Sequence, residues 1–270
     1  MSGLTAARGF LARTLLRAPA PLIFDDRVGS WSAAREQSTG YDEQVIVEQV
    51  AQATRAVLAG SAAFERDGVT FTEPEYRWPI AYALQRAARM PSVQARGQLR
   101  IIDIGGSLGS VYWQNRSLLP DVDISWTVIE QPAFVTASRA LRTNEVEFAE
   151  SIAALGPDAG ADVALFSSVL QYLEVPWTVL HEVTALGVHQ LVIDRTPFHE
   201  GSRDLATVQH VPAHIYPASY PAWILSRSRL ESELADWRIL AEFPGIEPAM
   251  RTRSGVPFTW SGCIAERIRK

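Results

Sequence analysis

Residues 99–110 read Leu-Arg-Ile-Ile-Asp-Ile-Gly-Gly-Ser-Leu-Gly-Ser, and a later apolar run over 126–129 ends in an acid, Glu130. A short apolar run that feeds a Gly-rich turn is typical of a buried strand that ends at a ligand. A second apolar run that ends in a carboxylate is typical of the neighbouring strand, where the acid accepts hydrogen bonds from ribose hydroxyls. The pair predicts a nucleoside site. The alternative is an ordinary tight β-to-α turn whose glycines serve only positive φ.

The spacing within the turn excludes two kinds of nucleotide site. A dinucleotide turn requires the pattern G-x-G-x-x-G, but counting from Gly105 the chain has Ser107 and Ser110 at the second and third glycine positions. A phosphate-binding loop of the G-x-x-x-x-G-K-[ST] type requires a lysine, and none is near. The order that remains is Asp103-x-Gly105-x-Ser107-x-Gly109.

This order resembles the first motif of class I S-adenosylmethionine-dependent methyltransferases, with Ser in place of one Gly. The resemblance implies that S-adenosyl-L-methionine is the cofactor, that the turn passes close to its methionine part, and that Glu130 holds its ribose. Asp103 would orient the turn or the amino group of the cofactor. The cofactor-binding residues implied by the resemblance are Asp103, Gly105, Gly106, Ser107, Gly109, Glu130, Gln131, Glu150 and Ser167.

The resemblance continues downstream. The segment 162–173, followed by Glu174-Val-Pro-Trp, is similar to the fourth strand of these methyltransferases and the loop after it, with Gln171-Tyr172 where the family often has Glu-His. Four blocks, at 103–110, 130–132, 167–173 and 194–198, together resemble a little-characterised family of methyltransferases associated with bacterial surface-polysaccharide and O-antigen gene clusters. That resemblance implies a sugar or glycan precursor as acceptor.

Composition sets broad limits on the function. The 270 residues carry a net charge of −5 and no basic block before the last few residues, so we expect no nucleic-acid partner. The single cysteine excludes an internal disulfide and fits a cytoplasmic protein. No run is long and apolar enough for a transmembrane helix. The Arg-bearing first 20 residues are expected to be frayed or packed, with a weak interfacial helix as the alternative.

The hydrophobic periodicity divides the chain at residue 90. Over 1–90 we expect a helical appendage, with helices at 31–37, capped by Ser30, at 42–59, and from a capping box at Thr72 and Glu75 to Met90. Over 91–270 the alternation predicts a Rossmann-like α/β domain with a mostly parallel seven-stranded sheet and a C-terminal antiparallel hairpin. The expected strands are 99–104, 125–130, 146–150, 162–167, 190–195, 237–243 and 258–267, and the expected helices are 109–118, 132–142, 176–186 and 226–236.

Residues 196–222 hold four prolines and lack clear periodicity, so we expect an irregular acceptor-binding loop. Asp194, at the carboxyl end of its strand, and His199 are the candidates for the base that removes a hydroxyl proton, and Tyr172 could bind acceptor or donor. Arg195 could bind an anionic acceptor. The further acceptor-binding candidates are His210, His214, Tyr216 and Trp223. The spacings of His, Cys and carboxylates indicate no metal site.

Three functions are consistent with these patterns. The leading hypothesis is S-adenosylmethionine-dependent O-methylation of a sugar or glycan precursor. The second is a non-catalytic module that binds S-adenosylmethionine or S-adenosylhomocysteine in a polysaccharide biosynthesis complex. The third is a nicotinamide-dependent dehydrogenase or epimerase, which the spacing of the turn disfavours. The oligomeric state does not follow from the sequence.

Overall fold

Five parallel strands form the centre of the sheet in the computed structural model, which describes residues 22–39, 43–141, 144–156, 160–211 and 218–268. Their spatial order is β6-β5-β4-β7-β8. At the far side of β8, strand β13 pairs with it antiparallel, and β11 pairs antiparallel with β13. The bounds are β4 Gln98–Ile104, β5 Asp123–Ile129, β6 Val146–Ala149, β7 Val163–Ser167, β8 Gln190–His199, β11 Trp237–Pro244 and β13 Pro257–Arg267.

Helices cover both faces of this sheet, which is why β4 and β7 are buried along almost their whole length. Ile80 and Leu84 of α4 join Trp126 of β5 in the core on one face. Trp177 and Leu180 of α8 lie in the core on the other face. The helices are α4 Trp78–Ala88, α5 Pro91–Arg96, α6 Ser110–Asn115, α7 Pro132–Ala137, α8 Pro176–Ala185 and α9 Arg227–Glu233, with short 3-10 turns η1 Arg116–Leu118, η2 Ser138–Ala140, η3 Ile152–Leu155 and η4 Leu170–Tyr172.

The Rossmann-like fold expected from the sequence is therefore confirmed, but the sheet is larger than seven strands. The segment expected to be an irregular loop contains two antiparallel strands, β9 Leu205–His210 and β10 Ser219–Ser226. These strands were not predicted because the prolines of the segment are typical of a loop. Pro221 lies in β10 at a point where that strand pairs on one side only, so its missing N–H leaves no gap in a ladder.

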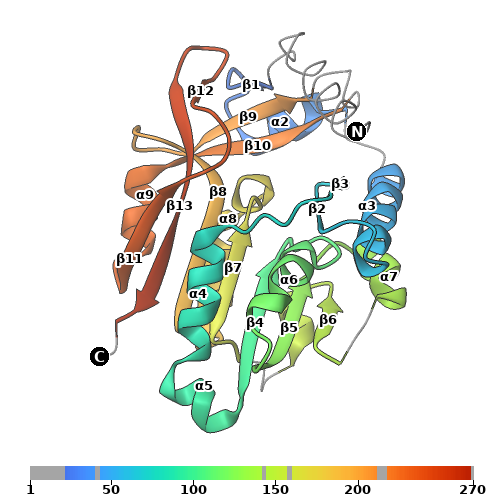
Figure 1. Cartoon of the computed structure of the whole chain (residues 1–270). Helices are drawn as coiled ribbons and strands as arrows, with labels where there is room; N and C mark the ends of the chain where they lie inside the picture. The colour runs from blue at the N-terminus through green and yellow to red at the C-terminus, as the bar shows by residue number, and fades with distance from the viewer. Residues whose placement is uncertain (1–21, 40–42, 142–143, 157–159, 212–217, 269–270) are drawn as a thin grey trace, which may run out of the picture.

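This ribbon extends the sheet beyond the end of β7 (Figure 1). The last two residues of β10, Leu225 and Ser226, pair in parallel with Phe198 and His199 of β8. A short strand from the N-terminal part, β1 Ile23–Asp25, pairs with β9 and closes the ribbon. A separate small core of Phe24, Phe258 and Trp260 lies beneath it.

The N-terminal part contains the expected helices α2 Trp31–Gln37, which Ser30 caps, and α3 Glu43–Leu58. Two expectations were wrong. The described part also has a hairpin, β2 Phe64–Arg66 and β3 Val69–Phe71, whose turn Asp67-Gly68 has positive φ at both residues, the geometry of a tight hairpin turn. The capping box at Thr72 opens no helix. Instead Pro79, in the first turn of α4, starts the helix at Trp78, because proline is favoured there.

Candidate functional site

The Gly-rich turn after β4 is built so that only glycine fits at two positions. A Cβ on Gly105 would lie 2.4 Å from a methyl group of Val169, and one on Gly106 would lie 2.5 Å from Oδ2 of Asp103. Ser107 has φ of 56°, a left-handed conformation that an L side chain adopts only at a cost. Gly109, with φ of 85°, is the N-cap of α6. The turn at the carboxyl end of β4 is thus strained, and its first two residues carry no side chain.

Asp103 lies directly beneath this turn and is almost completely buried. Its Oδ2 accepts a hydrogen bond from Nε1 of Trp126 at 3.2 Å, whereas its Oδ1 is buried without a partner. Burial raises the pKa of Asp103 to about 7, and the charge of Glu130 adds to the shift. A buried acceptor without a partner is uncommon and marks a place where a ligand donor can bind.

Glu130 follows β5 and faces the same turn. Its Oε1 accepts the backbone N–H of Ser107 at 3.2 Å, and its Oε2 accepts that of Gln131 at 2.8 Å. The acid predicted to hold a ribose therefore lies against the Gly-rich turn, as the spacing of the two motifs implied. Glu150, beyond the end of β6, is exposed and is the most peripheral of the predicted cofactor residues.

The carboxyl end of β7 lies beside Asp194, which was expected to stand at the end of its strand but lies within β8, because β8 continues to His199. Ser168, immediately after β7, has φ of 58° and donates its backbone N–H to the carbonyl of Asp194 at 2.9 Å. The hydroxyl of Ser167 donates to Oδ2 of Asp194 at 3.5 Å. Arg195, the next residue of β8, has φ of 53°. Left-handed residues other than glycine thus follow β4 and β7 and interrupt the adjacent strand β8, and such strain clusters at ligand sites.

Asp194 is fully buried, and its carboxylate is held by Arg77, the residue that precedes α4. Nη2 of Arg77 donates to Oδ1 at 2.6 Å, and Nε donates to Oδ2 at 3.4 Å. Sequence reasoning did not find Arg77. An aspartate at the end of an apolar strand does signal a cationic partner, because buried carboxylates are paired. Which of the many arginines pairs with it depends on the tertiary fold.

Arg195 links β8 to the N-terminal hairpin. Its Nε donates to Glu247 at 2.7 Å, and its Nη2 lies 3.5 Å from the carboxylate of Asp67 at the hairpin tip. Glu65 of the same hairpin is buried and accepts a hydrogen bond from Ser110, the first residue of α6. Burial raises the pKa of Glu65. The hairpin β2–β3 therefore contacts both the Gly-rich turn and the end of β8, above the carboxyl edge of the sheet (Figure 1).

Tyr172, in η4 after β7, contacts the β9–β10 ribbon, and Trp223 is a residue of β10 in that ribbon. The hydroxyl of Tyr172 donates to Gln209 of β9 at 3.1 Å, and burial of this hydroxyl raises the pKa of Tyr172 to about 12. The ring itself is 36% exposed. Trp223 stacks on Trp31 with ring centroids 5.3 Å apart. Tyr172 therefore offers an aromatic face, but it remains protonated at neutral pH.

The histidines are less closely connected to these residues. Nε2 of His199 donates to the carbonyl of Arg203 at 2.8 Å, and its Nδ1 accepts the N–H of Gly201, so both ring nitrogens hold the turn after β8. His210 ends β9, beside β1. His214 and Tyr216 lie outside the described residues. The roles of these four residues stay predictions.

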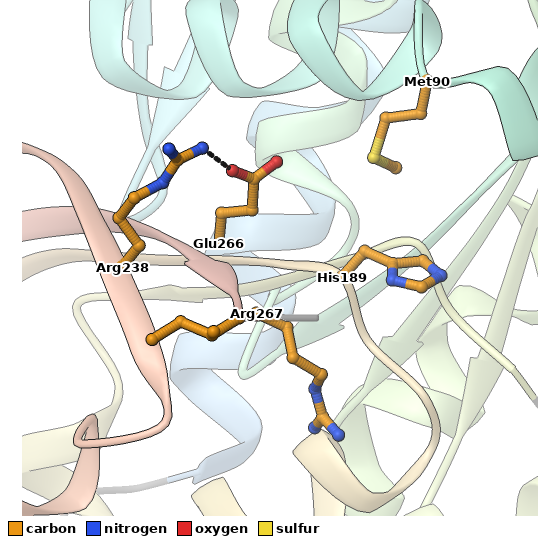
Figure 2. Close-up of a pocket in the computed structure, with 6 residues that line it drawn as sticks. Met90, His189, Arg238, Glu266 and Arg267 are labelled. Carbon is orange, nitrogen blue, oxygen red and sulfur yellow. Dashed lines mark hydrogen bonds and ion pairs between the residues drawn. The ribbon is translucent and has the colours of Figure 1, made fainter. Parts of the chain in front are cut away.

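Two hollows lie at the opposite edge of the sheet, where β8 begins. One, of about 330 Å³, is lined by Met90, His189, Arg238, Glu266, Arg267 and Ile268 (Figure 2). Within the part of the chain that the structure describes, no three metal-ligating side chains come together, and no helix has the length and apolar character to cross a membrane.

Comparisons with known proteins gave matches among solved structures alone. No family model matches the chain, and a search of curated proteins found no match. Solved structures that resemble it include a Burkholderia thailandensis 1,6-didemethyltoxoflavin N1-methyltransferase (16% identity, 84% of this chain and 90% of that one, TM-score 0.43). An amino pentose methyltransferase from Micromonospora echinaspora is 12% identical over 79% of this chain and 96% of that one, with a TM-score of 0.43. LepI, solved with SAM, is 15% identical over 98% of this chain but 63% of its own length, with a TM-score of 0.48.

The strand order itself defines the class. A parallel β6-β5-β4-β7-β8 sheet that continues into antiparallel β13 and then β11 is the class I methyltransferase fold. In open α/β sheets of this kind ligands bind outside the carboxyl ends of the strands, where the order reverses. The Gly-rich turn of β4 lies at that reversal, between β5 and β7.

Proposed function

We propose that this chain is an S-adenosylmethionine-dependent methyltransferase whose acceptor is a hydroxyl group of a sugar or glycan precursor. The observation that carries the proposal is the strand-end constellation of a glycine-restricted turn, the unpartnered Oδ1 of Asp103 and the carboxylate of Glu130. Residues 1–90 would cover a methyltransferase domain formed by 91–270.

The residues proposed to bind the cofactor, which we call the cofactor half of the site, fit their expected ligand in three respects. The side-chain-free surface at Gly105 and Gly106 admits a ligand close to the backbone. The unpartnered Oδ1 of Asp103 matches a positively charged amino group. Glu130 can exchange its hydrogen bonds from main-chain N–H groups for ribose hydroxyls. When bound, S-adenosylmethionine supplies an electrophilic methyl group on sulfonium. Glu150 and Ser167 would complete this half.

The residues proposed to bind the acceptor, which we call the acceptor half of the site, support a sugar as the acceptor for a different reason. Protein sites for polar rings combine a few convergent polar groups with apolar and aromatic faces. Here the exposed ring of Tyr172 lies near Arg195, which is 16% exposed, and near Asp67, which is 77% exposed. A guanidinium and a carboxylate can donate to and accept from neighbouring hydroxyls. Acceptor contacts are proposed on the same side for His210, His214, Tyr216 and Trp223.

Transfer to a hydroxyl also requires that its proton leave. Asp194 has both oxygens occupied by Arg77, so it must exchange a hydrogen bond before it can accept a proton from an acceptor. His199 is held in a turn, and Tyr172 is protonated. We propose that Asp194 or His199 is the base and that alignment of the two reactants supplies much of the rate. Because both carboxylate oxygens of Asp194 already accept hydrogen bonds from Arg77, the structure also favours a second candidate function, a non-catalytic cofactor-binding module.

Calorimetric titration with S-adenosylhomocysteine tests the cofactor half. We expect micromolar binding that Glu130→Ala abolishes and that Glu147→Ala, an exposed acid on the neighbouring strand, preserves. Equal binding by both variants, or none in the unchanged chain, would refute the cofactor assignment.

Transfer of labelled methyl to a pool of nucleotide sugars and glycan precursors tests the reaction. Arg195→Gln should reduce turnover of the acceptor while its affinity for S-adenosylhomocysteine stays within about twofold. Binding of S-adenosylhomocysteine without transfer to any acceptor in the pool would favour the non-catalytic module.

A further inference from the structure

Two neighbouring hollows share Met90 and Glu266 at the edge of the sheet opposite the proposed active site. The second hollow, of about 410 Å³, lies along α4 and is lined by Tyr82, Gln85, Arg86, Arg89, Met90, Pro91 and Glu266. Figure 2 shows the first, with the guanidinium of Arg238 reaching Glu266. Together they form one concave surface, which we call the α4–β13 groove.

The charge of this groove is opposite to that of the chain. Four arginines and one glutamate line it, although the whole chain carries a net charge of −5. Arg86 of α4 and Arg238 of β11 both bond to Glu266, one on each carboxylate oxygen. Because a single acid holds both guanidiniums, it draws two cationic groups from separate elements to one point. The carbonyls at the end of α4 offset this charge only in part.

The remaining cations have unused donors. Arg89 is exposed and forms no ion pair within the described ranges. Arg267 stacks on Trp237 at 5.1 Å and donates to the carbonyl of Thr184, but its Nε is buried without an acceptor. Its side chain points away from Glu266 in Figure 2, so it adds charge rather than a contact at that point. Arg86, Arg89 and Arg238 are the groups that can meet a ligand.

We propose that the α4–β13 groove binds the phosphate group of a ligand that also carries an apolar part. Guanidinium groups match the geometry of phosphate oxygens and can bind them in pairs. The apolar part is indicated by Met90 together with the exposed Tyr82 (48%) and Ile268 (50%), which border the same cations. This site does not depend on the methyltransferase assignment, because its residues come from the opposite edge of the sheet.

Two probes distinguish a small phosphorylated ligand from a lipid headgroup. Inorganic pyrophosphate is titrated calorimetrically into the full chain, and the chain is sedimented with vesicles of phosphatidylglycerol and phosphatidylcholine or of phosphatidylcholine alone. We expect at least one probe to bind, with affinity at least about tenfold weaker in the double variant Arg89→Gln, Arg238→Gln. The matched control is the double variant Arg55→Gln, Arg139→Gln, which removes two exposed arginines of α3 and η2 and so has the same loss of charge.

Each outcome decides the proposal. Pyrophosphate binding that only the groove variant loses assigns a small phosphorylated ligand, and anionic-vesicle binding with the same pattern assigns a lipid headgroup. Failure of both probes, or equal weakening by the control double variant, overturns the site. Both altered side chains of the groove variant are exposed, and circular dichroism checks that the variants fold. Should the groove variant unfold, Arg89→Gln alone carries the test against Arg55→Gln, because Arg89 forms no ion pair with an acid among the described residues.

Discussion

Asp103 shows how one residue can serve a ligand at the expense of stability. Its carboxyl group is buried beneath the Gly-rich turn, bonded on one oxygen and unpartnered on the other. A core selected for stability alone would fill this place with an apolar side chain, since a buried polar group without a partner costs about 1–3 kcal/mol. In the proposed cofactor site, a ligand would supply the hydrogen bond that Oδ1 of Asp103 lacks among the described residues.

The raised pKa of Asp103 leads to a pH prediction. Between the usual value near 4 and the folded value of about 7, the native state keeps a proton that the unfolded chain has lost. Stability then falls as pH rises through this window. Asp103→Asn should remove that fall. Between pH 5 and pH 8 the free energy of unfolding of the variant should therefore rise relative to that of the unchanged chain. The expected rise is a few kcal/mol, at about 1.4 kcal/mol per pKa unit. Urea unfolding at the two pH values measures this difference, and parallel pH profiles would contradict it.

A second prediction at this scale concerns Gly106. Ala at this position places a Cβ 2.5 Å from the buried oxygen of Asp103, which has no space to move. We expect a loss of about 1–3 kcal/mol in the free energy of unfolding, as for other overpacked sites. Gly160→Ala is the control, since its Cβ would meet its nearest neighbour at an ordinary 3.8 Å. Chemical denaturation of both variants gives the comparison, and similar losses would contradict the steric argument.

Among the elements, α4 depends on a charge at the residue that precedes it. Arg77 fastens the start of this helix to β8 through Asp194, and its Nη2 also reaches the carbonyl of Pro244 at 3.4 Å. Burial of the aspartate makes the two groups mutually dependent, because either one alone would be an uncompensated buried charge.

We therefore expect Arg77→Gln to cost about 3–5 kcal/mol of stability, because the buried carboxyl group of Asp194 loses its cationic partner. The double variant Arg77→Gln, Asp194→Asn should recover most of that loss. A double-mutant cycle by urea unfolding measures the coupling between them. Strictly additive losses would show that the pair contributes no mutual stabilisation.

The elements also show what the sequence could and could not predict. The helix α3 and the parallel strands other than β8 were predicted within one or two residues, because their apolar patterns are clear. The strand β8 was expected to end at residue 195 but continues to His199. The hairpin β2–β3 was missed although Asp67-Gly68 is a recognisable turn, because three-residue strands carry too little alternation. The β9–β10 ribbon was missed because its prolines suggested a loop. Arg77 could not be assigned, since its partner lies 117 positions away.

For the whole molecule, the cofactor half and the N-terminal hairpin belong to one unit, since Glu65 and Asp67 touch opposite sides of the site. A ligand bound there stabilises only the folded chain, by about 2.7 kcal/mol at a concentration of 100 Kd. We expect S-adenosylhomocysteine to raise Tm by several degrees in a single transition, and adenosine to raise it less. Scanning calorimetry measures both. Two separate transitions, of which only one responds, would mean that the hairpin and the sheet unfold independently.

The β9–β10 ribbon leaves the central sheet and returns at almost the same place, since its exit residue His199 and its last residue Ser226 are paired neighbours. An excursion of this kind resembles an appended cassette, because its length and loops can change while the register of β8 and β13 is preserved. If the ribbon contacts the acceptor, as proposed, evolution can change acceptor recognition there without altering the proposed cofactor site. We then expect a chimera that carries another chain's ribbon between these two residues to exchange one acceptor for another while its affinity for the cofactor is unchanged.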